Sequence, residues 1–312
     1  MDRMERKAAI IGFGCGQGAR DHGCADGPLY LRRAGLGGKA NWRMVLGTGD
    51  SSIPAMATLY DRLAALVTAA IRRGRFPIML GGDHSMAMGT WRGVLDTLKP
   101  NQSFRLIWID AHMDSHRPET SPSDALHGMP LACLLGHGDP RLALAPGRLR
   151  PSHVALLGVR SWEPEEADLL ARLGVQVVPM SRIPPGSLAR HLRHATSLPG
   201  ESYGLSIDLD GIDPHDAPGV GSPVPHGIRG GELVRALAPL LRSPHCLGLE
   251  IAEYNPHKDM EGRTAAVVKA LVSARENFHD IAHHSTGRDL SSPQLPAAAH
   301  RSGPGRRRFA VG

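Results

Sequence analysis

The chain has 312 residues, of which 41% are apolar, and this is enough to bury the core of one domain. Its formal net charge is +6, but the five arginines and one aspartate of residues 281–312 account for +4 of that value. These arginines are not interleaved with aromatic residues that could stack on bases, so we expect no specific nucleic-acid partner.

The cysteines and the apolar runs indicate in which cellular compartment the protein is expected. Four cysteines, at positions 15, 24, 133 and 246, follow neither the spacing of a zinc site nor that of a disulfide framework. No apolar run approaches the roughly 18 residues of a membrane-spanning helix. The charged first seven residues lead directly into a predicted strand and not into a signal-peptide core. We therefore expect a cytoplasmic protein without a membrane partner.

Strands and helices are predicted to alternate along the chain. Short, almost wholly apolar runs predict strands at 8–13, 44–46, 78–82, 106–110, 154–159, 175–179, 203–209 and 246–251. Helices are predicted at 55–73, 84–98, from 128 onward, and at 164–173, 187–196, 230–241 and 261–278. Strands that are apolar on both faces and separated by helices form parallel sheets. We expect a single-domain, three-layer α/β fold with a central parallel sheet of about eight strands flanked by helices.

Two stretches fall outside this alternation. The Gly-rich loop after the first strand nominally fits the dinucleotide fingerprint, but that motif needs a helix opening on its glycines, and 21–27 is irregular. We interpret this loop as a flexible wall near the functional site, followed by a helix whose first turn holds Pro28. Residues 283–312 are rich in Arg, Pro and Ser without periodicity, which predicts a disordered tail after a catalytic domain at 1–282.

Three predicted strands end in side chains that can bind metal ions. Asp110, His112 and Asp114 occupy every second position after a buried strand, and this spacing places all three on one face. The full set of candidates is His84, Asp110, His112, Asp114, Asp208 and Asp210. The carboxyl ends of parallel strands meet at one edge, so four carboxylates and two imidazoles could hold two divalent ions. An oxygen-rich site suits Mn or Mg, although imidazole also admits Zn, Fe or Ni.

Several motifs occur together in one order. They are Gly-Gly-Asp-His-Ser at 81–85, Asp-Ala-His-Met-Asp at 110–114, His-Gly-Met-Pro at 127–130, Ser-Ile-Asp-Leu-Asp-Gly-Ile-Asp-Pro at 206–214 and Glu-Tyr-Asn-Pro at 253–256. In this combination the chain resembles the ureohydrolase family of arginases and agmatinases over residues 8–280, and it is most similar to bacterial arginases. The resemblance implies two Mn²⁺ ions per subunit, hydrolysis of a small guanidino substrate to urea and an amine, and a homo-oligomer, either trimer or hexamer.

The resemblance also implies a role for each site residue. It assigns one ion to His84, Asp110, Asp114 and Asp208, and the other to His112, Asp110, Asp208 and Asp210. A hydroxide bridging the ions would then attack the guanidinium carbon. His127 matches the proton shuttle, since the departing amine needs a proton, and Glu253 matches the carboxylate that holds the guanidinium.

The loop that selects the substrate departs from the arginase pattern. Arginases place one Asn two residues after the last Asp of the strand motif and another two residues before the His, where this chain has His116 and Ala125. The remaining substrate contacts implied are Ser123, Ser222 and Glu163, the last standing where arginases carry an Asp. L-Arginine is the expected substrate. The alternatives are agmatinase, guanidinobutyrase and formimidoylglutamase-like activities, and a noncatalytic binding member of the fold.

Overall fold

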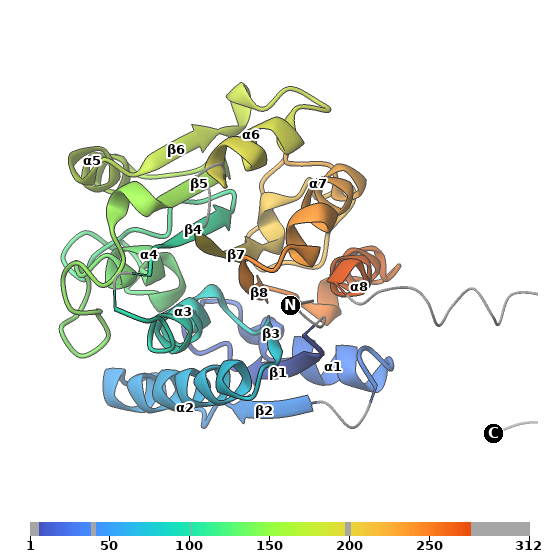
Figure 1. The fold of residues 1–312 in the computed structure, drawn as a ribbon, viewed down its shortest axis with the longest axis horizontal. Coiled ribbons are helices and arrows are strands. Elements are labelled where there is room, and N and C mark those ends of the chain that lie inside the picture. The colour runs from blue at the N-terminus through green and yellow to red at the C-terminus, as the bar shows by residue number, and fades with distance from the viewer. Residues whose placement is uncertain (1–5, 39–41, 101, 197–200, 276–312) are drawn as a thin grey trace, which may run out of the picture. The chain divides into compact units, whose positions relative to one another are not determined.

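The computed structural model describes residues 6–38, 42–100, 102–196 and 201–275, and the predicted C-terminal tail lies outside them. Its strands are β1 (Ala8–Gly14), β2 (Trp42–Leu46), β3 (Phe76–Gly81), β4 (Phe104–Ile109), β5 (Val154–Val159), β6 (Gln176–Pro179), β7 (Ser202–Asp208) and β8 (Cys246–Ala252). They form one sheet in the order β2-β1-β3-β8-β7-β4-β5-β6, and every neighbouring pair is parallel (Figure 1). The predicted eight-stranded parallel sheet is confirmed.

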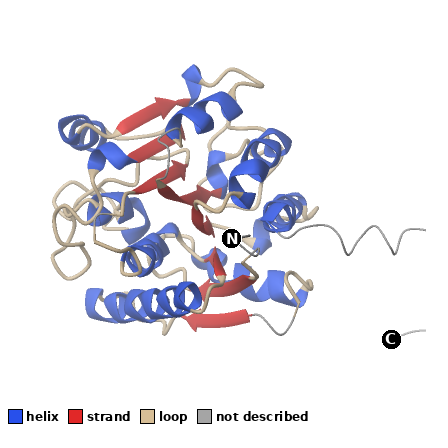
Figure 2. Cartoon of the chain, viewed as in Figure 1, coloured by secondary structure: helices blue, strands red, loops and turns tan. Residues whose placement is uncertain are grey.

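Helices cover both faces of this sheet (Figure 2). They are α1 (Gly27–Arg33), α2 (Ile53–Arg72), α3 (Ala87–Leu95), α4 (Pro130–Leu134), α5 (Pro164–Leu173), α6 (Leu188–Ala195), α7 (Gly230–Arg242) and α8 (Arg263–Arg275). Buried side chains of α2, α3, α4 and α5 pack on one face, and those of α1, α6, α7 and α8 pack on the other. The result is the three-layer α/β architecture expected from the alternation of strands and helices.

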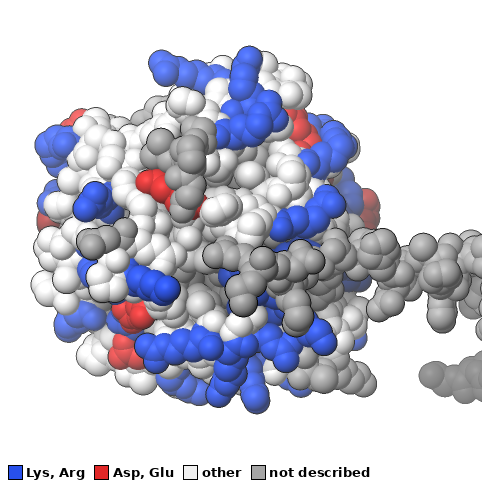
Figure 3. All heavy atoms as spheres, viewed as in Figure 1, with Lys and Arg blue, Asp and Glu red and all other residues white. Residues whose placement is uncertain are grey.

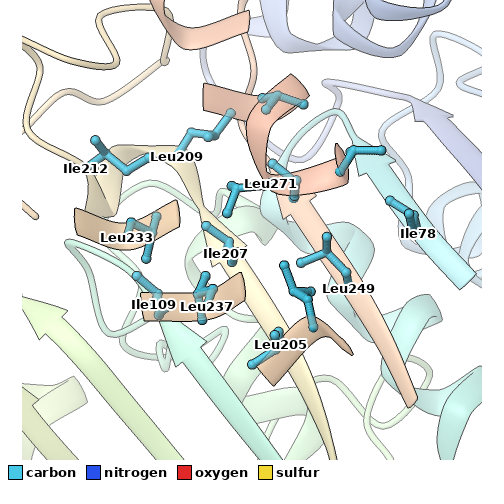
Figure 4. Packing of buried hydrophobic residues seen from close by; sticks show 14 of the residues in the cluster. Ile78, Ile109, Leu205, Ile207, Leu209, Ile212, Leu233, Leu237, Leu249 and Leu271 are labelled. Carbon is cyan, nitrogen blue, oxygen red and sulfur yellow. The ribbon is translucent and has the colours of Figure 1, made fainter. Parts of the chain in front are cut away.

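The two cores follow from the strand sequences. Successive side chains of a strand point to opposite faces, so Ile207 of β7 and Leu249 of β8 face α7 and α8 (Figure 4). They lie in one cluster with Leu233, Leu237 and Leu271 of those helices. Each such fully buried side chain contributes about 1.5–3 kcal/mol to folding. Trp108 of β4 points to the other face and belongs to the second cluster.

Some element ends differ from their predicted positions. The predicted helix 164–173 coincides with α5, but the helix expected from 84 to 98 starts only at Ala87, after a single 3₁₀ turn, and ends at Leu95. The helix expected from 128 is the short α4, which ends at Leu134. Gly136 follows with φ +86°, a conformation that no helix continues through.

The Gly-rich loop lies beside the carboxyl end of β3. Gly18 N donates a hydrogen bond to Asp83 Oδ2 (3.0 Å), and Gly18 O accepts one from His127 N (3.0 Å). A side chain at position 18 would bring its Cβ within 2.5 Å of Asp83 Oδ1, so only glycine allows this approach. The loop therefore lies against the segments that carry Asp83 and His127. These hydrogen bonds hold it in place, so it is less flexible than predicted.

The surface is more basic than the net charge suggests. Figure 3 shows Lys and Arg side chains spread over the viewed face, with few Asp and Glu among them. Many acidic side chains are instead buried, namely Asp83, Asp110, Asp114, Glu166, Asp208, Asp210, Glu250, Glu253 and Asp259. Within the described residues, no helix is long and apolar enough to cross a membrane.

Candidate active site

The predicted metal ligands meet at one edge of the sheet. β3, β8, β7 and β4 are successive neighbours, so their carboxyl ends lie side by side. His84 follows β3 after a tight turn, and Asp110 follows β4 directly. Asp208 is the last residue of β7, and Asp210 lies two residues beyond it. Three of these strands, β3, β4 and β7, thereby bring residues that are far apart in the sequence into two side-chain clusters.

The first cluster surrounds the ring of His84. Its Nδ1 lies 3.3 Å from Asp110 Oδ2, 3.1 Å from Asp114 Oδ2 and 3.0 Å from Asp208 Oδ2, and all four side chains are buried. Neither His84 Nδ1 nor Asp114 Oδ2 has a hydrogen-bond partner among the described residues. Buried carboxylates without donors are costly unless a cation compensates them. The cluster therefore has the donor set and the geometry of a cation site.

The second cluster shares one residue with the first. His112 Nδ1 lies 3.1 Å from Asp210 Oδ2 and 3.6 Å from Asp110 Oδ1. Asp110 thus turns one oxygen toward each cluster, which is the arrangement expected of a bridging carboxylate. In this arrangement Asp208 groups with the first cluster, and its Oδ1 accepts a hydrogen bond from Asp210 N (2.9 Å).

The electrostatics of these carboxylates also favour a cation. Burial raises the pKa of Asp208 well above its usual value, and the charges of Asp210 and Asp110 raise it further. Burial would raise the pKa of Asp110 too, but the neighbouring imidazoles of His112 and His84 hold that pKa far below the usual range. The protein thus concentrates more negative charge at this edge than its own cationic groups can neutralise.

A buried chain of hydrogen bonds fixes the orientation of His84. Its Nε2 lies 3.0 Å from Ser206 Oγ, which donates a hydrogen bond to Glu250 Oε1 (2.6 Å). Trp91 Nε1 donates to the same carboxylate oxygen (3.1 Å). Such outer partners set the tautomer and direction of a ligating imidazole, and here they leave Nδ1 facing the three aspartates.

Glu253 and His127 lie beside the first cluster. Glu253 has φ +66°, and its N–H donates to Gly82 O (2.8 Å), which holds this unfavourable backbone in place. Its Oε1 accepts a hydrogen bond from His84 N (2.9 Å) and lies 3.2 Å from His127 Nδ1. Burial lowers the pKa of His127, but Glu253 and the nearby carboxylates outweigh it and raise that pKa to about 9.

The predicted substrate contacts divide into two groups. His116 Nε2 lies 3.1 Å from Glu163 Oε2, so these two side chains are together. Ser123 and Ser222 are exposed, and Ser123 Oγ accepts a hydrogen bond only from Ala125 N, 3.3 Å away, among the residues described. Gly221, next to Ser222, faces Glu253 Oε2, since a Cβ there would lie 3.6 Å from that oxygen.

Two residues at this edge were not predicted from the sequence. Arg160, directly after β5, donates hydrogen bonds to main-chain oxygens of the two segments that carry Asp210 and Val224. Glu166 accepts a hydrogen bond from Ser115 N (3.1 Å) and lies 3.6 Å from His116 Nε2. The sequence does contain a pattern that could have identified each of them. Arg160 directly follows a buried strand, as the metal ligands do, and Glu166 stands three residues after Glu163, as in a capping box.

Comparison with known proteins decides the family. The family model described as "Arginase family" matches residues 6–275. The chain belongs to the arginase family. It is 39% identical to the arginase of Bacillus caldovelox over 235 residues, which cover 72% of this chain and 78% of that protein. The crystal structure of arginase from Bacillus cereus is similar with a TM-score of 0.78 and 33% identity, covering 86% of this chain and 98% of that one.

Another similar structure is a complex with a ligand. Arginase of Entamoeba histolytica, in complex with L-ornithine, is similar with a TM-score of 0.79 and 26% identity over 87% of this chain and 99% of that one. Members of the arginase family are metal-dependent hydrolases that act on the guanidino group of arginine. This chain is accordingly an arginase-like ureohydrolase with Asp and His clusters that could bind metal.

Proposed function

We propose that the protein hydrolyses L-arginine to L-ornithine and urea with two Mn²⁺ ions per subunit. The observation that carries this proposal is the pair of Asp and His clusters that share Asp110. The L-ornithine bound by the Entamoeba histolytica relative supports the same substrate. The oxygen-rich donor sets suit manganese better than ions that prefer thiolates. When bound, the ions supply Lewis acidity, which lowers the pKa of a water toward neutrality.

The ligand sets proposed are those implied by the family resemblance. His84, Asp110, Asp114 and Asp208 would hold one ion, and His112, Asp110, Asp208 and Asp210 the other. The unpartnered Nδ1 of His84 and Oδ2 of Asp114 support the first set, since each is a buried donor atom without another use. The second set is supported by His112 Nδ1, which faces both Asp210 and Asp110.

Glu253 would bind and orient the guanidinium. The described hydrogen bonds to its carboxylate end on Oε1, which leaves Oε2 to accept a charge-assisted hydrogen bond from the guanidinium of the substrate. Its unusual backbone conformation fixes the carboxylate beside His84, so the guanidinium carbon would lie against the metal centre. Orientation of this kind contributes to catalysis by removing the entropy cost of alignment from the reaction step.

His127 would supply the proton that the departing amine requires. With its pKa raised to about 9, the imidazole is protonated near neutral pH and can act as a general acid. Its side chain is 27% exposed while Nδ1 stays at Glu253, so a proton can be regained from solvent. The leaving amine would otherwise depart as an amide anion, which is not feasible in water.

The substrate tail would lie near Glu163, His116, Ser123 and Ser222. The carboxylate of Glu163 could attract the α-ammonium of L-arginine. The two amides that bind the substrate carboxylate in arginases are replaced by His116 and Ala125, which favours agmatine, 4-guanidinobutyrate or a formimino compound as alternatives. For the same family reasons we propose a trimer or hexamer, and four free cysteines are consistent with a cytoplasmic location.

The test is product release by Mn²⁺-loaded protein from L-arginine, agmatine and 4-guanidinobutyrate, with metal content measured on the same sample. We expect two Mn²⁺ per chain and the highest kcat/KM with L-arginine. A preference for agmatine or 4-guanidinobutyrate would move the assignment within the family. No urea from any of them, together with less than one metal ion per chain, would replace it with the noncatalytic alternative.

A further inference from the structure

One more group of potential metal ligands lies at the rim of the site, outside the two clusters that have Asp110 in common (the shared clusters). It consists of His116, Glu163 and Glu166, whose ligand atoms all lie within 4.8 Å of one another. His116 Nε2 is 3.1 Å from Glu163 Oε2 and 3.6 Å from Glu166 Oε2. The His116 and Glu166 side chains are 8% and 3% exposed, whereas Glu163 is 54% exposed. We call this group the rim triad.

The rim triad is held in place by the backbone around it. Ser115 N donates to Glu166 Oε1 (3.1 Å), and Glu163 N donates to Glu166 Oε2 (3.0 Å) at the start of α5. His116 N donates to Gly128 O (3.0 Å), while His116 Nδ1 lies 3.2 Å from Thr120 Oγ1. With Nδ1 engaged there, Nε2 is the ring atom that faces the two carboxylates. The three ligand atoms therefore converge before any ion is bound.

No lysine or arginine compensates these carboxylates within the part of the chain that the structure describes. The nearest basic residue in the sequence, Arg117, pairs with Glu119, 2.9 Å away. Glu163 and Glu166 each have His116 as their recorded ion-pair partner. Burial raises the pKa of Glu166 to about 7, while the neighbouring Glu166 side chain lowers the pKa of Glu163, so the two carboxyls can share one proton. A divalent cation at the rim triad would take the place of that proton.

We propose that the rim triad is a third divalent-cation site, for a transition-metal ion of the Zn²⁺ type. One imidazole and two carboxylates are donors that Zn²⁺ accepts, and water can complete a four-coordinate shell on the open side at Glu163. The site differs from the two shared clusters, because none of its residues belongs to them. His116 makes it possible, since an asparagine there would offer no strong nitrogen ligand.

The inference also has a consequence for turnover, and this part rests on the proposed function. If Glu163 attracts the ammonium of L-arginine, an ion on the rim triad competes with the substrate tail. Zn²⁺ at this site therefore raises the KM for L-arginine and leaves kcat unchanged, because the shared clusters keep their ions.

The experiment titrates Mn²⁺-loaded protein with Zn²⁺ and counts both metals after gel filtration. We expect one Zn²⁺ per chain to be taken up while the Mn²⁺ content stays constant. Removing an outer partner of a metal ligand typically lowers metal affinity by roughly 10–100-fold. His116→Asn removes a ligand itself, so it should lower the affinity for Zn²⁺ at least as much. Glu163→Gln, at a half-exposed position, should do the same, and it keeps the size of the side chain at the start of α5. The matched control is His215→Asn, an exposed histidine paired with Asp216 on another loop.

The outcomes separate the two proposals, because metal counting does not depend on activity. Zn²⁺ uptake that is lost in His116→Asn and Glu163→Gln but kept in His215→Asn supports the third site, even if no urea is formed. Uptake matched by an equal loss of Mn²⁺, uptake unchanged in both rim variants, or no uptake at all would overturn it. A rise in kinetic KM with Zn²⁺ in the native protein and not in His116→Asn would locate the competition at the rim triad.

Discussion

Replacing Arg160 by alanine should destabilise the protein at the edge that carries the site. Arg160 directly follows β5. Its guanidinium donates hydrogen bonds to the main-chain oxygens of Gly158, Asp210, Gly211, Ile212, Val224 and Pro225. It thereby joins the segment after β7, which carries Asp210, to the segment that precedes α7. Both segments border the metal clusters.

The expected loss of stability can be calculated from the shortest of these hydrogen bonds. Three of them are short, from Nη2 to Asp210 O and Val224 O (2.7 Å each) and from Nε to Pro225 O (3.0 Å). A hydrogen bond with a charged donor contributes about 1.5–3 kcal/mol, which gives an upper limit of about 5–9 kcal/mol for three. Arg160 is only partly buried, so water would replace part of this. We expect Arg160→Ala to lower the free energy of unfolding by about 2–4 kcal/mol.

Urea denaturation of Mn²⁺-loaded protein measures this change, with metal content as a second readout. Arg160→Lys should be intermediate, because an ammonium cannot span both segments. The control is Arg148→Ala, since the Arg148 and Asp96 side chains are 44% and 48% exposed and such pairs contribute about 0–1 kcal/mol. If Arg160→Ala unfolds within about 1 kcal/mol of the native protein and keeps its metal, the bracing role assigned to Arg160 is wrong.

Three further changes probe the site itself. Asp110→Ala should abolish metal binding and urea release together, and an active, metal-loaded variant would contradict the shared-ligand assignment. Glu250→Gln should weaken Mn²⁺ binding by about 10–100-fold in a metal titration, because His84 loses its outer carboxylate partner, and unchanged affinity would contradict this. His127→Asn should lower kcat by about 10²–10⁴-fold with two Mn²⁺ still bound. In the native protein, turnover should fall as pH rises through about 9, where the His127 imidazolium loses its proton, and this decline should be absent in His127→Asn.

The architecture and the metal clusters could be predicted because they depend on periodicity. Apolar runs without polar alternation predict strands covered on both faces, and parallel strands must end at one edge. Asp110, His112 and Asp114 follow such a strand and therefore lie close to the ends of neighbouring strands, wherever those strands lie in the sequence. The prediction that they share one face of an extended chain was wrong, because β4 ends at Ile109 and Asp114 has φ +48°. The structure places all six predicted ligands at that edge.

The missed features depend on contacts that spacing does not encode. Arg160 has the same position after its strand as Asp110 has, but the six carbonyl oxygens it binds come from folded loops whose paths cannot be read from residue types. Glu166 has the signature of a helix start, and its contact with His116 arises only once the loop after Asp114 turns toward α5. The shortness of α4 follows from Gly136, whose left-handed backbone ends the helix.

The position of β8 has a consequence for how the chain can fold. β8 lies between β3 and β7, so it joins β2-β1-β3 to β7-β4-β5-β6 although it is the last strand along the chain. During synthesis both half-sheets can form, but each exposes an unpaired inner edge until residue 252 has emerged from the ribosome. His84 belongs to one half-sheet and Asp110 to the other. The first cluster can therefore assemble only after β8 has closed the sheet, whereas the second cluster lies within one half-sheet, and a chain stalled before β8 would be prone to aggregate.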